Sequence, residues 1–155
     1  MLVDAEAHMG LALDEARAAL EHGDVPVGAV VVLQEDDGTA RVVARRHNER
    51  ELLHDPTAHA ELLALRDASS VLGRWRLSDC TLVATLEPCA MCAGAALHAR
   101  VGGVVFGAFD LKAGALSSRY HLLADPRLNH QAEVVGGVRA GECAALLDDF
   151  FAARR

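Results

Sequence analysis

Four residues in two short segments of this chain have the types and spacing of a catalytic metal site. His59 and Glu61 stand two residues apart, and Cys89 and Cys92 stand three residues apart directly after a proline. One imidazole and two thiolates give zinc three protein ligands, which leaves the fourth tetrahedral position for water. Zinc makes such a water ionise near neutral pH, so the site would produce a nucleophile, with Glu61 as its proton carrier.

The spacing of these residues restricts how helices can present them. Cys89 and Cys92 share one face of a helix, and the proline before them places both in its first turn. There the free N–H groups and the positive end of the helix dipole favour thiolates. His59 and Glu61 would point to nearly opposite sides within a helix, so both reach one site only from its very start. The spacing therefore predicts two helix N-termini that converge on one metal ion.

The elements that must position this site alternate between helix and strand patterns. Amphipathic or capped patterns predict helices over residues 4–22, 88–99 and 142–153. A further helix is predicted to begin at Thr57, with Thr57 as its N-cap. Apolar, valine-rich runs predict strands over residues 26–33, 39–45, 81–85, 103–108 and 133–138, the first two as a hairpin. Residues 47–56 are expected to form a loop, and 110–129 an irregular stretch. This alternation predicts an α/β layered sheet.

Composition limits the kind of protein this is. At 155 residues the chain is expected to form a single domain over residues 1–155, and an apolar fraction of 52% argues against disorder. A formal net charge of −7 argues against a general nucleic-acid coat protein, which would be basic. Any RNA affinity would have to come from a local patch and would be strongly salt-sensitive.

The cysteines and the N-terminus predict a cytoplasmic protein. Asp4 and Glu6 replace the basic start of an export signal, and no apolar run reaches the ~20 residues that span a bilayer. We therefore expect a soluble protein with reduced thiols and no membrane partner. Cys80 and Cys143 lack C-x-x-C spacing and are expected to be buried as small hydrophobic residues. A C-x-x-C pair alone could also be redox-active or half of a structural zinc site, but the histidine and glutamate argue against both.

The two metal-site segments resemble the H-x-E and P-C-x-x-C signature of the cytidine and deoxycytidylate deaminase superfamily. They extend over residues 55–61 and 85–95. Other segments resemble, more narrowly, the bacterial tRNA-specific adenosine deaminases; they are residues 24–30, Asn48, 75–77, 104–108, 128–130 and 142–151. The resemblance implies a three-layer α/β/α cytidine deaminase-like fold with a central mixed sheet of about five strands flanked by helices. It also implies one zinc ion per subunit and a homodimer, with the helix after the cysteines near the interface.

The resemblance further implies a reaction and the residues that perform it. The family converts the wobble adenosine of an arginine tRNA anticodon to inosine. Zinc held by His59, Cys89 and Cys92 would activate water, and Glu61 would pass protons to the purine ring and to the departing amine. Asn48 would hydrogen-bond the flipped purine.

Contacts to the tRNA anticodon stem-loop are also implied by the resemblance. Asp110 and Lys112 match a family segment that approaches the anticodon loop, and Arg154 and Arg155 match basic residues that could contact phosphate. Residues 114–119 depart from the family's usual glycine-serine run. DNA is not expected as a partner.

Two other functions remain open at this point. A free nucleobase or nucleotide deaminase, acting on guanine or cytosine, would use the same zinc ligands and the same glutamate. A non-catalytic, zinc-stabilised RNA-binding or dimerisation module would need the ligands but not Glu61. The intact Glu61 therefore favours an enzyme.

Overall fold

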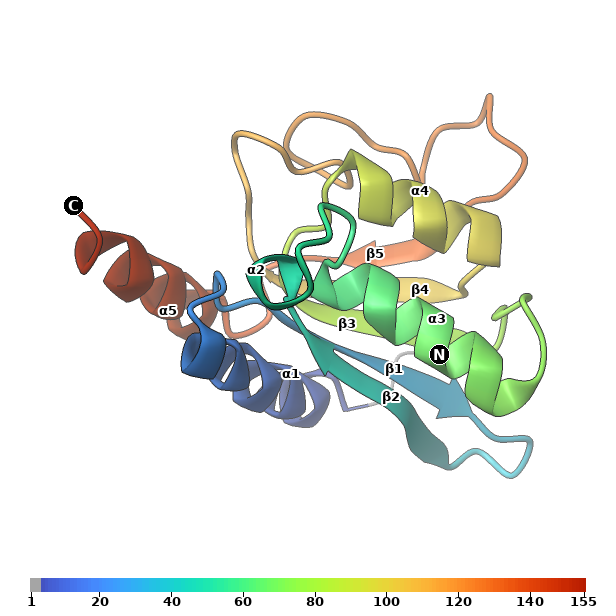
Figure 1. Ribbon diagram of the computed structural model, residues 1–155. Helices are drawn as coiled ribbons and strands as arrows, with labels where there is room; N and C mark the ends of the chain where they lie inside the picture. The colour runs from blue at the N-terminus through green and yellow to red at the C-terminus, as the bar shows by residue number, and fades with distance from the viewer. Residues whose placement is uncertain (1–3) are drawn as a thin grey trace.

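The computed structural model describes residues 4–155, which form a five-stranded sheet between two layers of helices (Figure 1). The helices are α1 (Ala5–Ala19), α2 (Arg50–Leu53), α3 (Ala60–Leu72), α4 (Ala90–Ala99) and α5 (Ala140–Ala152), with a 3-10 turn over Leu20–His22. The strands are β1 (Gly28–Gln34), β2 (Ala40–His47), β3 (Cys80–Leu86), β4 (Gly103–Ala108) and β5 (Glu133–Val135).

The sheet is mixed, as the family resemblance implies. Its spatial order is β2-β1-β3-β4-β5. Strand β1 pairs antiparallel with both neighbours, and β3, β4 and β5 run parallel to one another. Because β3 and β4 are parallel, the segments that follow them leave the sheet at the same edge, where they can share in one site.

Helices α1 and α5 cover one face of the sheet, and α3 and α4 cover the other (Figure 1). Successive side chains of a strand point to opposite faces. Accordingly Val31 and Leu33 of β1 join the core under α3 and α4, whereas Val30 and Val32 join the core under α1 and α5. Burial on both faces explains why the strands read as continuous apolar runs in the sequence.

Helix α1 lies unusually close to β1 at Gly28. A Cβ atom at this position would collide with the backbone carbonyl of Ala12 and the backbone nitrogen of Ala16. The N–H of Gly28 donates to the hydroxyl of Thr85 in β3, at 3.1 Å. Gly28 therefore lets the first helix rest directly on the sheet at the strand end nearest the metal-site residues.

The sequence prediction of a loop over residues 47–56 is wrong, because α2 lies within it. The carboxylate of Asp24, which is 1% exposed, accepts hydrogen bonds from the backbone N–H groups of Glu51 at 2.7 Å and Leu52 at 3.1 Å. These bonds satisfy N–H groups that a single turn of helix cannot satisfy by itself. The helix thus depends on a residue that is distant in the sequence.

The predicted start of α3 at Thr57 is also wrong. The N–H and the hydroxyl of Thr57 both donate to Oδ1 of Asp55, at 2.9 and 2.8 Å, so Thr57 belongs to a turn that Asp55 closes. The N-cap is His59, and the helix begins at Ala60.

Several other sequence predictions are confirmed. Strand β4 has the predicted bounds, residues 110–129 contain no helix, and Cys80 and Cys143 are buried. No helix within residues 4–155 is both long and apolar enough to cross a membrane.

Candidate active site

His59 and Cys89 occupy equivalent places at the starts of two neighbouring helices. His59 is the N-cap of α3 and Cys89 the N-cap of α4, both with extended backbone conformations (ψ of 148° and 176°). Glu61 and Cys92 then fall in the first turns of α3 and α4. The extended backbone at each N-cap turns the side chain across the helix end, and the two N-termini converge as the spacing predicts.

The donor atoms of His59, Cys89 and Cys92 have the separation that zinc requires. Nδ1 of His59 lies 3.6 Å from the Sγ atoms of both Cys89 and Cys92. Tetrahedral zinc with usual bond lengths to nitrogen and sulfur separates such donors by about 3.6 Å. All three donors lie within 4.8 Å of one another, and no fourth histidine, cysteine or carboxylate within residues 4–155 completes the group. The donor set therefore fits a zinc ion with one position left for a small ligand.

The thiols and Glu61 have altered acidities. A hydrogen bond with Cys92, helped by His59, lowers the pKa of Cys89 to about 3, so Cys89 is a thiolate. The same hydrogen bond, together with burial, raises the pKa of Cys92, which keeps the shared proton until a metal ion replaces it. Burial raises the pKa of Glu61, whose side chain is 4% exposed. A carboxyl group with a raised pKa is suited to accept and return a proton near neutral pH.

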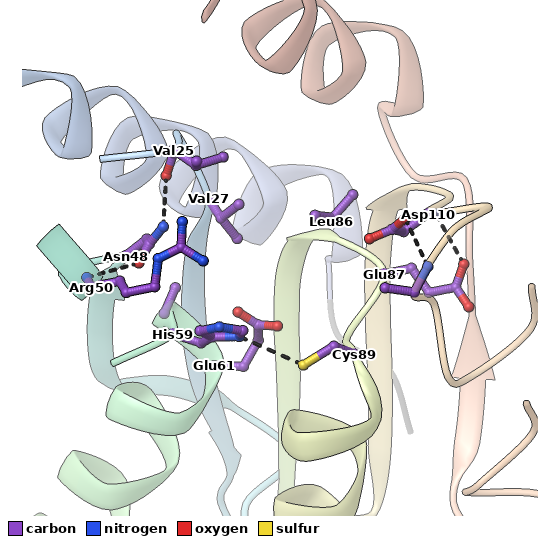
Figure 2. Close-up of a pocket in the computed structure, with 12 residues that line it drawn as sticks. Val25, Val27, Asn48, Arg50, His59, Glu61, Leu86, Glu87, Cys89 and Asp110 are labelled. Atoms are coloured by element: carbon purple, nitrogen blue, oxygen red, sulfur yellow. Dashed lines mark hydrogen bonds between the residues drawn. The ribbon is translucent and has the colours of Figure 1, made fainter. Parts of the chain in front are cut away.

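A cavity of about 200 Å³ opens beside these residues (Figure 2). Apolar side chains form much of its wall; they are Val25, Val27, Ala60, Leu86 and Ala113. Asn48 also lines the cavity and is buried. Its Nδ2 donates to the carbonyl of Val25 at 3.2 Å, and its Oδ1 accepts from the N–H of Arg50 at 3.0 Å. These two bonds fix the orientation of the amide at the cavity wall.

The structure brings only one of the four predicted RNA-contacting residues to the cavity. Asp110 lines it, whereas Lys112 is exposed outside it and donates its backbone N–H to Oδ1 of Asp110 at 3.1 Å. Arg154 folds back over the ring of Phe150, 3.4 Å from the ring centre, and donates to the Phe150 carbonyl. Arg154 and Arg155 are exposed at the end of α5 and do not line the cavity.

Sequence reasoning missed Glu87, a buried residue that shapes the cavity. Its carboxylate is 1% exposed and accepts five hydrogen bonds from the segment after β4. The donors are the backbone N–H groups of Asp110, Leu116, Ser117 and Ser118 and the hydroxyl of Ser118. Burial alone would raise the pKa of Glu87, but these bonds outweigh burial and lower it.

Gly114 is part of the same junction. A Cβ atom at this position would collide with the carboxylate of Glu87, and Gly114 forms an isolated β-bridge with Cys89. The segment after β4 is thereby held against the start of α4. An acidic residue at the end of an apolar strand, directly before Pro88-Cys89, was the sequence signal for this role.

Arg50 was also missed. It is the only arginine or lysine that lines the cavity within the described residues, and Figure 2 shows its guanidinium between Asn48 and His59. No sequence pattern indicates this role, because the position of Arg50 depends on α2.

Comparison with known proteins places the chain among deaminases. Residues 2–108 match the family described as the cytidine and deoxycytidylate deaminase zinc-binding region. The tRNA-specific adenosine deaminase of Bacillus subtilis (strain 168) is 49% identical over 146 residues, which cover 94% of this chain and 88% of that protein.

Solved structures agree with this comparison. A structure from a study of A-to-I editing by tRNA:A34 deaminases has a TM-score of 0.83 and 44% identity, and the match covers 91% of this chain and 99% of that one. Guanine deaminase from Nitrosomonas europaea has a TM-score of 0.81 and 28% identity, with coverage of 98% and 87%. The predicted cytidine deaminase-like fold is confirmed.

Proposed function

Because the chain belongs to the cytidine and deoxycytidylate deaminase family, we propose that it is a zinc-dependent tRNA adenosine deaminase. It converts the adenosine at the wobble position of a tRNA anticodon to inosine and releases ammonia. An arginine tRNA is the substrate that we propose, on the basis of the sequence resemblance.

The observation that carries this proposal is the combination of an open metal site with a buried carboxylate and a fixed amide. His59, Cys89 and Cys92 offer three zinc donors, Glu61 lies beside them, and Asn48 lines the same cavity. A purely structural zinc site would have four protein ligands and no use for the carboxylate.

We propose that Glu61 carries the protons of the reaction. Bound zinc would supply the Lewis acidity that makes water a nucleophile near neutral pH. Glu61 accepts the proton of the attacking water and delivers a proton to the purine ring nitrogen. It then takes the proton of the new C6 hydroxyl and gives it to the departing amine; the C6 carbonyl forms as the C–N bond breaks, so that adenosine and water give inosine and ammonia. The raised pKa of Glu61 supports this exchange, since a strongly acidic carboxylate would not return the proton.

We propose that the remaining cavity residues hold the flipped base. The fixed Asn48 amide hydrogen-bonds the purine, and the apolar side chains of Val25, Val27 and Leu86 pack against its faces. Asp110 binds the nucleotide at the cavity opening. Lys112, Arg154 and Arg155 remain proposed contacts to more distant parts of the anticodon stem-loop.

We propose that the enzyme works as a homodimer in the cytoplasm. A groove between α3 and α4 is lined by Leu62, Leu65, Trp75, Ala95 and Ala99, together with Arg66, Ser69 and His98. Trp75 is 62% exposed. A second copy would cover this groove, which agrees with the interface expected near the helix after the cysteines. Sedimentation of the wild-type protein and of Trp75→Glu tests it: the charge should yield monomers, and an unchanged mass would contradict the interface.

One assay tests the proposed function directly. Zinc-loaded protein is incubated with an arginine tRNA anticodon stem-loop, with guanine and with cytosine, and inosine and ammonia are measured. Inosine from the stem-loop alone supports the proposal. Turnover of guanine or cytosine but not RNA would establish the free-base alternative, to which the 28% identical guanine deaminase points.

A further inference from the structure

We propose that Arg50 binds the phosphate beside the flipped nucleotide and so selects polynucleotide over free base. This inference rests on the proposed tRNA substrate and identifies a specificity residue that the sequence did not reveal. The guanidinium of Arg50 is charged, and no residue within 4–155 pairs with that charge.

The guanidinium of Arg50 forms no ion pair and no side-chain hydrogen bond within residues 4–155; only its backbone N–H and carbonyl are bonded. The two other arginines of this part of the sequence do form ion pairs. Arg45 pairs with Glu15 at 3.3 Å, and Arg46 pairs with Glu49 at 3.1 Å and Asp67 at 2.9 Å. Arg50 therefore differs from both of these neighbours in presenting an unpaired charge at the wall of the cavity that holds the metal-site residues.

The acidic residues of the cavity do not neutralise Arg50. Glu61 is buried beside the metal donors, and Glu87 is occupied by its five hydrogen bonds. Oδ1 of Asp110 accepts from the N–H groups of Lys112 and Ala113. The positive charge of Arg50 is therefore available to an anionic ligand.

The backbone that carries Arg50 is firmly anchored. The buried carboxylate of Asp24 holds α2 through Glu51 and Leu52, and Asn48 accepts the N–H of Arg50 itself. This arrangement ties Arg50 to the amide proposed to bind the purine. A base held by Asn48 thus has its attached sugar and phosphate within the region that the Arg50 side chain can reach.

The size of the cavity favours a phosphate, and not part of the base, as the group that Arg50 binds. At about 200 Å³ the cavity is smaller than the ~300–1,000 Å³ typical of sites for drug-sized ligands. A cavity of this size would admit a base and leave the sugar–phosphate backbone outside, and the Arg50 side chain is exposed to solvent. Adenine itself is neutral and offers no charge to a guanidinium. The forked donors of arginine match phosphate oxygens well.

Salt-dependent RNA binding tests the inference. The variants Arg50→Gln and Arg50→Lys are compared with Arg41→Gln, which removes an arginine from the distant β1–β2 hairpin. All three are made in a zinc-loaded Glu61→Gln background, so that the stem-loop is bound but not converted. Affinity is measured by fluorescence anisotropy at several salt concentrations, with zinc content and melting temperature as checks on folding.

We expect Arg50→Gln to weaken stem-loop binding by about 10–100-fold. The slope of log affinity against log salt should become shallower by about 0.7, the value for one lost phosphate contact on a single strand. Arg50→Lys should keep the slope, and Arg41→Gln should change neither quantity. An unchanged slope in Arg50→Gln, or an equal effect of Arg41→Gln, would overturn the inference. Failure of wild-type enzyme to release inosine from the stem-loop would instead overturn the proposed function, so the two failures are distinguishable.

Discussion

Replacement of Glu87 by glutamine should destabilise the protein strongly, although the two side chains have nearly the same shape. Oε1 of Glu87 accepts two of its five hydrogen bonds and Oε2 accepts three. An amide presents one oxygen and one NH₂ group. With the NH₂ in place of Oε1, the Ser118 hydroxyl can turn to accept from it, but the N–H of Asp110 would face another donor. Each donor left unsatisfied in a buried setting costs about 1–3 kcal/mol. The free energy of unfolding should therefore fall by at least about 1–3 kcal/mol.

Urea unfolding of zinc-loaded wild-type protein and Glu87→Gln at pH 7 measures this loss. The pH dependence gives a second, independent readout. Because the folded state lowers the pKa of Glu87, its contribution is present at pH values above the unfolded pKa and is lost as the pH falls through the folded pKa. Glutamine does not titrate, so the difference between the two proteins should narrow in acid, below the ordinary pKa of 4.5. Zinc content is measured at each pH, so that release of the metal is separated from the titration of Glu87.

A matched control is Asp125→Asn, which alters a carboxylate that binds Arg127 at the surface and should change stability far less. Equal urea midpoints for wild type and Glu87→Gln at pH 7 would refute the reasoning. A stability difference that stayed constant down to acid pH would show that the charge of Glu87 is not responsible.

Three further substitutions test the site and the fold. Glu61→Gln should keep one zinc ion per chain and lose about 10²–10⁴-fold in turnover of the stem-loop; wild-type turnover in this variant would contradict its role as proton carrier. Cys89→Ala should lose zinc and unfold at lower denaturant, and a full zinc content would show that Cys89 is not a ligand. Gly28→Ala should lower the free energy of unfolding by about 1–3 kcal/mol, because the added Cβ atom collides with the backbone of Ala12. Gly141→Ala in α5 is the control, because a Cβ atom there has no atom within 4 Å and should not lower stability. Thermal unfolding compares the two variants with the wild-type protein.

The metal site could be predicted from sequence because its information is local. The spacing of His59 and Glu61, and of Cys89 and Cys92, restricts each pair to a helix start, and the structure places each pair at one. Strand β4 could be predicted equally well, because Gly103–Ala108 is a continuous apolar run that is buried at every position.

The remaining features depend on contacts between distant residues. Helix α2 has only four residues and is held by Asp24, so no periodic pattern reveals it. Thr57 looks like a helix cap until Asp55 engages both its N–H and its hydroxyl. Glu87 binds groups 23 to 31 residues further along the chain. Such roles follow from the pairing of β3 with β4, which composition and spacing do not specify.

The bonds of Glu87 also determine when the cavity can form as the chain is made. Glu87 directly follows β3, whereas the groups that donate to its carboxylate follow β4 and extend to Ser118. Until that segment has emerged from the ribosome, the wall of the cavity is missing and a buried carboxylate has no partners. The zinc donors, all complete by Cys92, are synthesised well before then. During synthesis all three zinc donors are thus available before the segment that completes the cavity wall.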